Sequence, residues 1–209
     1  LDGDTREPLF VSGPSGSGKS AILARLCTEY TYAPAEAAAI EHEQPHRNGR
    51  RPATFLGRLR AVFSRTPDAP AGHFESFVLP HFIGATASST SVPSMLRRLC
   101  RELQERFELP GEIPGNDTEL PGTFRAFLGM VPETTRALVI IDALDQLDAR
   151  DREMGLYWLP DEFPANIKIV VSCLDDLGGS ALLEELTKRG HPRLRVEPLT
   201  DADCETIID

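Results

Sequence analysis

Features that would direct a protein to a membrane, to nucleic acid or to an oxidising compartment are missing from this chain of 209 residues. No apolar run approaches the roughly 18–20 residues of a membrane-spanning helix, and no secretory signal opens the sequence. The net charge is −10, which argues against a nucleic-acid or anionic-membrane surface as the main partner, because phosphates favour clustered Lys and Arg.

Closely spaced cysteines are also missing. The four cysteines are far apart and form no C-x-x-C pair: Cys27, Cys100, Cys173 and Cys204. Neither a zinc site nor a disulfide is indicated, so we expect reduced, buried thiols in a cytoplasmic protein.

The length fits one sizeable α/β domain with a substantial core. The chain does not begin with Met, and residues 200–203 resemble a capping box that opens a helix near the end. We therefore expect a segment of a longer protein, with a single domain over residues 1–209.

Short β-prone apolar runs recur along the chain and alternate with helical patterns. The runs that predict strands are 9–12, 77–84, 138–142, 167–172 and 194–197. The patterns that predict helices are 91–107, with Ser91 as N-cap, a segment near 124–131, and 180–189. This alternation predicts parallel strands joined by right-handed crossovers, with helices on both faces of the sheet.

Residues 13–20 read G-x-x-x-x-G-K-S, the pattern of a phosphate-binding P-loop between a strand and a helix. Glycines let successive backbone N–H groups face one anion, and the N-terminus of the following helix adds a partial positive charge. Lys19 would contact the β- and γ-phosphates, and the Ser20 hydroxyl would bind Mg²⁺. The residues expected to bind nucleotide are Gly13, Pro14, Ser15, Gly16, Ser17, Gly18, Lys19, Ser20 and Ala21. The alternative is a Gly/Ser-rich turn that contains a lysine by chance.

A second acidic motif follows the apolar run 138–141. Such a run predicts a central strand, and Asp142 at its tip would lie where open α/β sheets bind ligands. Asp142 would position Mg²⁺ together with Ser20, and Asp145 could orient or deprotonate an attacking water. With Lys19 these two carboxylates form the expected catalytic set. The alternatives are a strand-end turn for Asp142 and a polar helix start for Asp145.

Other polar residues are given lesser roles. We expect a group of acidic residues to lie at solvated loops and helix starts: Asp148, Asp151, Asp161, Asp175 and Asp176. Ser172 could sense the γ-phosphate weakly, whereas Cys173 cannot supply a positive charge. Residues 31–72 are rich in Ala, Pro, Arg and His, which predicts a flexible basic insertion. The alternative is a docking segment for an acidic partner or for another part of the full-length protein.

With these elements placed, the chain resembles the nucleotide-binding domain of STAND NTPases, and most of all the NACHT-type domains of NACHT/WD-repeat and related scaffold proteins. The resemblance lies in LFVSGPSGSGKSAILA (9–24), HFIGAT (81–86) with Ser89 and Thr90, VIIDALDQL (139–147), IKIVVS (167–172) and EPLT (197–200). It covers nearly the whole chain except 31–72.

The resemblance implies a three-layer fold with a parallel five-stranded sheet of order 5-1-4-3-2. It also implies ATP or GTP with Mg²⁺, a helical lid that begins where this chain ends, repeat domains in the full-length protein, and a switch that can form nucleotide-dependent oligomers. Many members carry an arginine on the sensor strand, at the position of Cys173 here.

These observations favour an ATP-binding switch domain with slow Mg²⁺-dependent hydrolysis. The absence of N-K-x-D, the guanine-reading motif, favours ATP over GTP. Two alternatives stay open: a P-loop kinase that transfers phosphate to a small acceptor, and a nucleotide-binding scaffold without turnover. Arg97, Arg98 and Arg101 lie on a helix patterned for packing, which speaks against a kinase lid.

Overall fold

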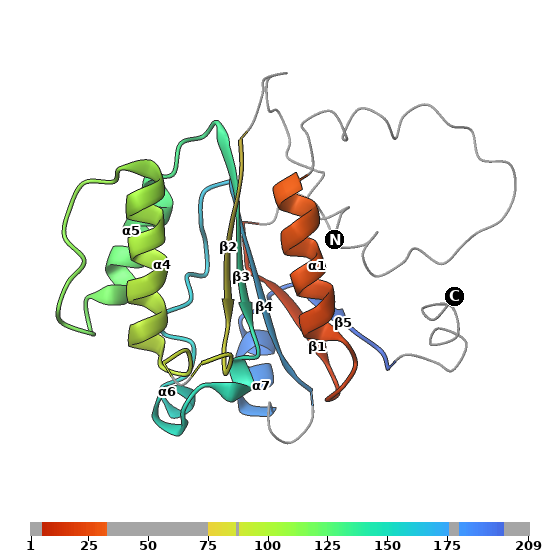
Figure 1. Cartoon of the computed structure of the whole chain (residues 1–209). Helices are drawn as coiled ribbons and strands as arrows, with labels where there is room; N and C mark the ends of the chain where they lie inside the picture. Colours follow the sequence, from red (N-terminus) through yellow and green to blue (C-terminus); the bar gives the residue numbers. More distant parts are fainter. Residues whose placement is uncertain (1–5, 33–74, 87, 176–179, 199–209) are drawn as a thin grey trace, which may run out of the picture.

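The computed structural model describes residues 6–32, 75–86, 88–175 and 180–198. Five strands form one parallel sheet of order β2-β3-β4-β1-β5 (Figure 1). The strands are β1 (Leu9–Gly13), β2 (Glu75–Phe82), β3 (Thr135–Asp142), β4 (Ile167–Leu174) and β5 (Arg193–Arg195). This is the predicted order 5-1-4-3-2 read from the other edge, so the predicted P-loop NTPase fold is confirmed.

The register of the sheet brings the candidate motifs to one edge. Gly13 at the end of β1 lies opposite Leu174 at the end of β4, and Asp142 ends β3, the next strand across. Because all strands are parallel, their carboxyl ends meet at the same edge. The two motifs are separated by β4 alone.

Alternating side chains of the central strands supply two hydrophobic cores. Val139, Ile141 and Phe10 face one core, whereas their neighbours Leu138 and Ile140 face the other. A strand covered on both faces needs apolar residues at every position, which explains the continuous run in β3.

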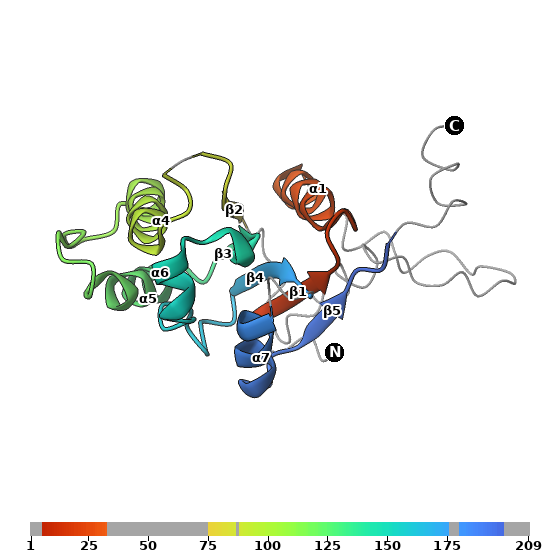
Figure 2. The ribbon, with the colours of Figure 1, turned by 90° about the horizontal axis from the view of Figure 1, so that it is seen from below.

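Helices cover both faces of the sheet. One face is covered by α1 (Lys19–Tyr32), whose Leu23 and Leu26 are buried against it. Figures 1 and 2 show α4 (Val92–Phe107), α5 (Leu120–Met130) and α7 (Ser180–Lys188) on the side away from α1. These helices match the predicted ones to within a few residues.

Ser91 is the N-cap residue of α4, as predicted, whereas the expectation for Asp151 is wrong. Ser91 occupies the N-cap position of α4 but makes no side-chain capping bond. Instead, Asp151 of the short helix α6 (Ala149–Glu153) accepts a hydrogen bond from the Val92 amide at 2.7 Å. Asp151 was expected at the solvated surface, yet it is only 6% exposed, because it satisfies the orphan amide of a buried helix end.

The predicted insertion also changes at its first residues. Residues 31 and 32 belong to α1, and the Thr31 hydroxyl donates to the carbonyl of Cys27 on the preceding turn at 2.8 Å. The remaining residues of the 31–72 prediction lie outside the described part of the chain, as do Asp176, Cys204 and the capping box at 200–203. Within the described ranges, no helix is long and apolar enough to cross a bilayer.

Cysteine placement follows the prediction in part. Cys100 and Cys173 are buried and Cys27 is half-buried, and all three are free thiols. Burial raises the pKa of Cys100 and Cys173 to about 12, so both stay protonated at neutral pH.

Candidate functional site

The loop between β1 and α1 has the open, glycine-dependent shape that a phosphate cradle requires. Gly16 and Gly18 have φ values of +76° and +85°, and a Cβ added at either would meet no atom within 4 Å among the described residues. The loop is closed by a hydrogen bond from the Ser17 amide to the Pro14 carbonyl at 3.3 Å. The helix α1 then begins at Lys19, so its first amides have no partner within the helix and face the ligand side.

Lys19 lies over this loop and is 8% exposed. Its ammonium donates to the carbonyl oxygens of Gly13 and Pro14, each at 2.9 Å, and approaches Ser17 Oγ at 3.5 Å. These acceptors are neutral, so Lys19 keeps its full positive charge available for an anion at the loop.

Across the sheet edge, Asp142 is held by a hydroxyl of the neighbouring strand. Ser172 Oγ donates to Asp142 Oδ1 and accepts from the Ala143 amide at 2.9 Å. Both Asp142 and Ser172 are buried, with exposed fractions of 3% and 0%. Ala143 adopts the left-handed region with φ of +62°, an uncommon conformation for a residue with a side chain.

The chain then makes a single 3-10 turn, η1 (Leu144–Gln146). Leu144 and Leu147 are buried in the core on either end of this turn, so Asp145 and Gln146 stay at the sheet edge. Asp145 Oδ1 accepts a hydrogen bond from the Leu174 amide at 2.9 Å, which ties η1 to the end of β4.

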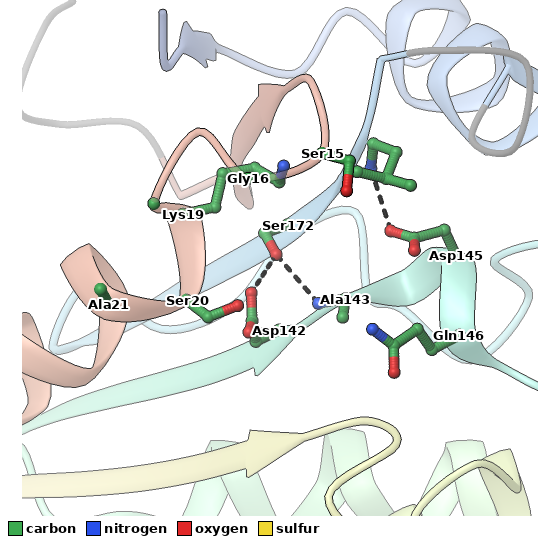
Figure 3. A pocket seen from close by; sticks show the side chains of 12 residues that line it. Ser15, Gly16, Lys19, Ser20, Ala21, Asp142, Ala143, Asp145, Gln146 and Ser172 are labelled. Carbon is green, nitrogen blue, oxygen red and sulfur yellow. Dashed lines mark hydrogen bonds between the residues drawn. The ribbon is translucent and has the colours of Figure 1, made fainter. Parts of the chain in front are cut away.

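These walls enclose one pocket of about 350 Å³ (Figure 3). It is lined by Ser15, Gly16, Gly18, Lys19, Ser20, Ala21, Asp142, Ala143, Asp145, Gln146, Ser172 and Leu174. The P-loop and the second acidic motif, more than a hundred residues apart in sequence, therefore face the same space. Gly13, Pro14 and Ser17 were also predicted to bind nucleotide, but they do not line this pocket. Their hydrogen bonds instead hold Lys19 and close the loop.

The donor set of this pocket fits magnesium. Mg²⁺ binds oxygen and is usually held by one or two carboxylates together with substrate phosphates and waters. Figure 3 shows the Ser20 hydroxyl on the side of the Asp142 carboxylate, so these two oxygens could hold the ion jointly. Among the described residues, no group of three or more His, Cys, Asp or Glu side chains could hold a metal by itself, so phosphates and waters would supply the other ligands.

Sequence reasoning gave no role to Gln146 or Leu174, although both line the pocket. Leu174 contributes its backbone amide, for which sequence carries no signal. Gln146 follows Asp145 directly, and that position next to a candidate catalytic residue is the one signal that could have identified it.

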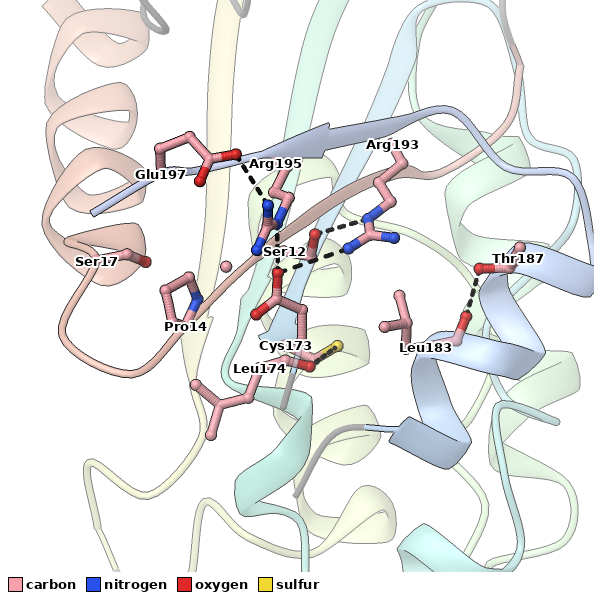
Figure 4. Close-up of polar contacts among 12 residues, drawn as sticks. Ser12, Pro14, Ser17, Cys173, Leu174, Leu183, Thr187, Arg193, Arg195 and Glu197 are labelled. Carbon is pink, nitrogen blue, oxygen red and sulfur yellow. Dashed lines mark hydrogen bonds and ion pairs between the residues drawn. The ribbon is translucent and has the colours of Figure 1, made fainter. Parts of the chain in front are cut away.

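A cluster of charged side chains lies beside the P-loop, outside the pocket (Figure 4). Arg195 of β5 forms an ion pair with Asp175 at 2.7 Å and a second one with Glu197 at 3.0 Å. Arg193 donates to Ser12 Oγ at 2.7 Å and lies 3.7 Å from Asp175. The Asp175 side chain is only 9% exposed, so the expectation of a solvated position is wrong.

Comparison with known proteins agrees with this architecture. The chain is 28% identical over 103 residues to NACHT and WD repeat domain-containing protein 2 of Mus musculus, which covers 49% of this chain and 6% of that protein. It is 29% identical over 174 residues to a TPR repeat-containing protein of Dictyostelium discoideum, covering 65% of this chain and 10% of that protein. The chain thus spans a small part of both relatives.

A solved structure shares the fold at low sequence identity. The ORC2 protein of Aeropyrum pernix superposes with a TM-score of 0.52 and 13% identity, covering 99% of this chain and 46% of that one. The model of the AAA ATPase domain family matches residues 1–171, which include the P-loop, the second acidic motif, the strands β1, β2 and β3, and the first residues of β4. The expected P-loop NTPase relationship is therefore confirmed, and the chain belongs to the AAA ATPase domain family.

Proposed function

We propose that this domain binds ATP with Mg²⁺ and acts as a nucleotide-dependent switch, with slow hydrolysis, inside a larger protein. The observation that carries the proposal is the single pocket lined by Lys19 and Ser20 on one wall and by Asp142 and Asp145 on the other. In this role the loop amides, Lys19 and Ser20 hold the phosphates, Asp142 positions Mg²⁺ and Asp145 orients the attacking water. Bound Mg²⁺ would neutralise phosphate charge.

The position of Lys19 suggests how binding would change the loop. Its ammonium now contacts the neutral carbonyl oxygens of Gly13 and Pro14. A phosphate carries full negative charge, so it attracts the ammonium more strongly than a neutral carbonyl oxygen does. Lys19 would therefore transfer to the nucleotide, which alters the contacts at the start of the loop.

Slow turnover is expected from the charges of the pocket. Of its twelve lining residues, Lys19 is the one cation, whereas Asp142 and Asp145 are both acidic. An additional arginine at the transferred phosphoryl group raises the rate of related enzymes by about 10³–10⁵. Without such a group in the pocket lining, a long-lived triphosphate state is favoured, as a switch requires.

The relatives support a role within a larger assembly. The names of two relatives include TPR repeats and WD repeats, and the chain covers 10% and 6% of their lengths. We expect the same kind of setting here: a lid and repeat domains in the full-length protein that respond to the nucleotide, and oligomers that form in one nucleotide state.

Thermal unfolding of the 209-residue chain with and without nucleotide tests the proposal. MgATP at about 100 times its Kd should add roughly 2.7 kcal/mol to the unfolding free energy, and MgGTP should add less. Lys19→Ala should abolish the shift, because it removes the phosphate-binding charge. Lys188→Ala is the matched control, since Lys188 is 77% exposed on α7, away from the pocket lining. A melting curve that no nucleotide changes would rule the proposal out.

A further inference from the structure

We infer that the side-chain amide of Gln146 donates a hydrogen bond to the γ-phosphate, in addition to the contacts of the P-loop, and that it makes this domain bind ATP more tightly than ADP. The inference rests on the proposed function. It assigns a ligand contact to a side chain that sequence reasoning left without a role.

Hydrogen bonds from three successive backbone amides hold the turn that carries Gln146. The Gln146 amide donates to the Ala143 carbonyl at 2.9 Å, and the Leu147 amide donates to Leu144 at 3.2 Å. The next amide, of Asp148, donates to Thr90 at 3.0 Å and joins the turn to the segment before α4. This turn is therefore in place before a ligand arrives, and no backbone rearrangement is needed to present Gln146 to the pocket.

The Gln146 side chain lies directly over Gly84, which follows β2. A Cβ added to Gly84 would lie 1.9 Å from Gln146 Oε1 and 3.1 Å from its Cδ. Gly84 also has φ of +83°, which favours glycine over every other residue. The bare backbone of Gly84 therefore provides the space in which the Gln146 amide lies. Figure 3 shows the amide nitrogen on the Ala143 side and the oxygen on the side of β2.

Three other hydrogen-bond donors on this wall of the pocket are already used. Ser172 donates to Asp142, the Ala143 amide donates to Ser172, and the Leu174 amide donates to Asp145. Among the described residues, no hydrogen bond engages the side-chain amide of Gln146, so its nitrogen is a side-chain donor on this wall that a ligand can use.

Charge explains why a neutral donor fits this wall. Asp142 and Asp145 both face the pocket, so an oxygen of the terminal phosphate brought toward them meets negative charge. The Gln146 nitrogen donates to that oxygen without adding charge to the site. On the proposed binding mode Asp145 must lie near the terminal phosphate, because it orients the water that attacks there. Its neighbour Gln146 then lies beside the same phosphate.

Two arginines of β5 do not compete for this role. Arg193 and Arg195 are bonded to Ser12, Asp175 and Glu197, and neither lines the pocket. Figure 4 shows both guanidinium groups within the charged cluster beside the P-loop.

Calorimetric titration of the 209-residue chain with a non-hydrolysable ATP analogue and with ADP, each with Mg²⁺, tests the inference. Gln146→Met keeps the length of the side chain and removes its polar amide. Gly84→Ala leaves Gln146 intact but fills the space that it occupies. Both variants should bind the ATP analogue about tenfold or more weakly and ADP within about twofold of the parent, since one hydrogen bond to a charged group is lost.

Gly190→Ala is the matched control for Gly84→Ala. Gly190 has φ of +76°, so the substitution introduces similar backbone strain, but nothing among the described residues lies within 4 Å of the added Cβ. This control should keep the parent's preference for the ATP analogue.

The outcomes separate the two proposals. If the parent binds both nucleotides and Gln146→Met weakens both equally or neither, the inference is wrong and the proposed function stands. A parent that binds the ATP analogue and ADP equally well also overturns the inference alone. A parent that binds no nucleotide overturns both.

Discussion

The Ser172 hydroxyl joins the ends of β3 and β4, because it donates to the buried Asp142 carboxylate and accepts from the Ala143 amide at 2.9 Å. One side chain thus satisfies a charged acceptor and a backbone donor at the edge of the sheet. Removing it leaves both groups buried without this partner, and buried unpaired polar groups are costly.

Ser172→Ala should therefore lower the free energy of unfolding by about 2 kcal/mol, the cost of a lost hydrogen bond to a charged group. Urea denaturation of the variant and the parent measures this difference. Ser88→Ala is a suitable control because Ser88 is exposed, and it should change stability by less than about 0.5 kcal/mol. A Ser172→Ala variant as stable as the control would show that water replaces the hydroxyl without cost.

Asp145→Asn should separate hydrolysis from binding. Asparagine keeps an oxygen that can accept from the Leu174 amide, so η1 should stay in place. Loss of the carboxylate should slow hydrolysis by about 10²–10⁴, the usual contribution of a positioned acid or base, while the Kd for MgATP changes little. Steady-state phosphate release and calorimetry give the two quantities. Equal losses in rate and affinity would instead make Asp145 a metal-positioning residue.

Gly13→Ala should destabilise the folded P-loop even without nucleotide, because the new side chain clashes with the backbone that follows β5. The added Cβ would lie 2.4 Å from the Val196 carbonyl oxygen and 2.8 Å from Ser17 Oγ, and a backbone atom cannot move away cheaply. We expect a loss of about 1–3 kcal/mol in stability, typical of overpacking. Gly122→Ala in α5 is the contrast: nothing described lies within 4 Å, so it should stabilise by about 0.5–1 kcal/mol. Equal thermal shifts for the two variants would contradict this explanation.

Asp151 should make stability depend on acidic pH. Burial, together with the nearby charge of Asp148, raises the pKa of Asp151, although the Val92 amide lowers it in part. Since the folded state then binds the proton more tightly than the unfolded state, the contribution of Asp151 is greatest below its ordinary pKa and falls as pH rises through the raised value. Asp151→Asn keeps an acceptor for Val92 and has no charge to bury.

Relative to the parent, Asp151→Asn should therefore gain stability between acidic and neutral pH. Urea denaturation at several pH values measures this gain, and parallel pH profiles for the two proteins would refute it. Asp151→Ala should be less stable than Asp151→Asn at every pH, by about 0.5–2 kcal/mol, because it removes the cap of α4.

The sheet could be predicted from the sequence where burial dictates composition. Residues 138–142 are an unbroken apolar run with a terminal carboxylate, and the structure places them in an interior strand, β3, between β2 and β4. The first two residues of β3, Thr135 and Arg136, were not predicted as strand because they are polar. They pair with Glu75 and Ser76 of β2, a contact that only the assembled sheet provides.

The candidate site was predictable to the extent that it lies in local motifs. The P-loop and Asp142 carry their chemistry in adjacent residues, so a single sequence reveals them. The cap that Asp151 provides to α4 joins residues 59 positions apart, and no local pattern encodes it. The space for Gln146 likewise depends on Gly84, which follows β2. No local pattern links the two residues, because the fold alone brings Gly84 next to the Gln146 side chain.

The contact between Gly13 and Val196 has a mechanical consequence. The Val196 amide donates to the Ser12 carbonyl at 2.7 Å, while its own carbonyl oxygen lies so close to Gly13 that no side chain fits between them. A displacement of Gly13 toward Val196 would therefore press on the backbone that leaves β5. We expect the start of the phosphate cradle to transmit such a displacement to the polypeptide at Val196.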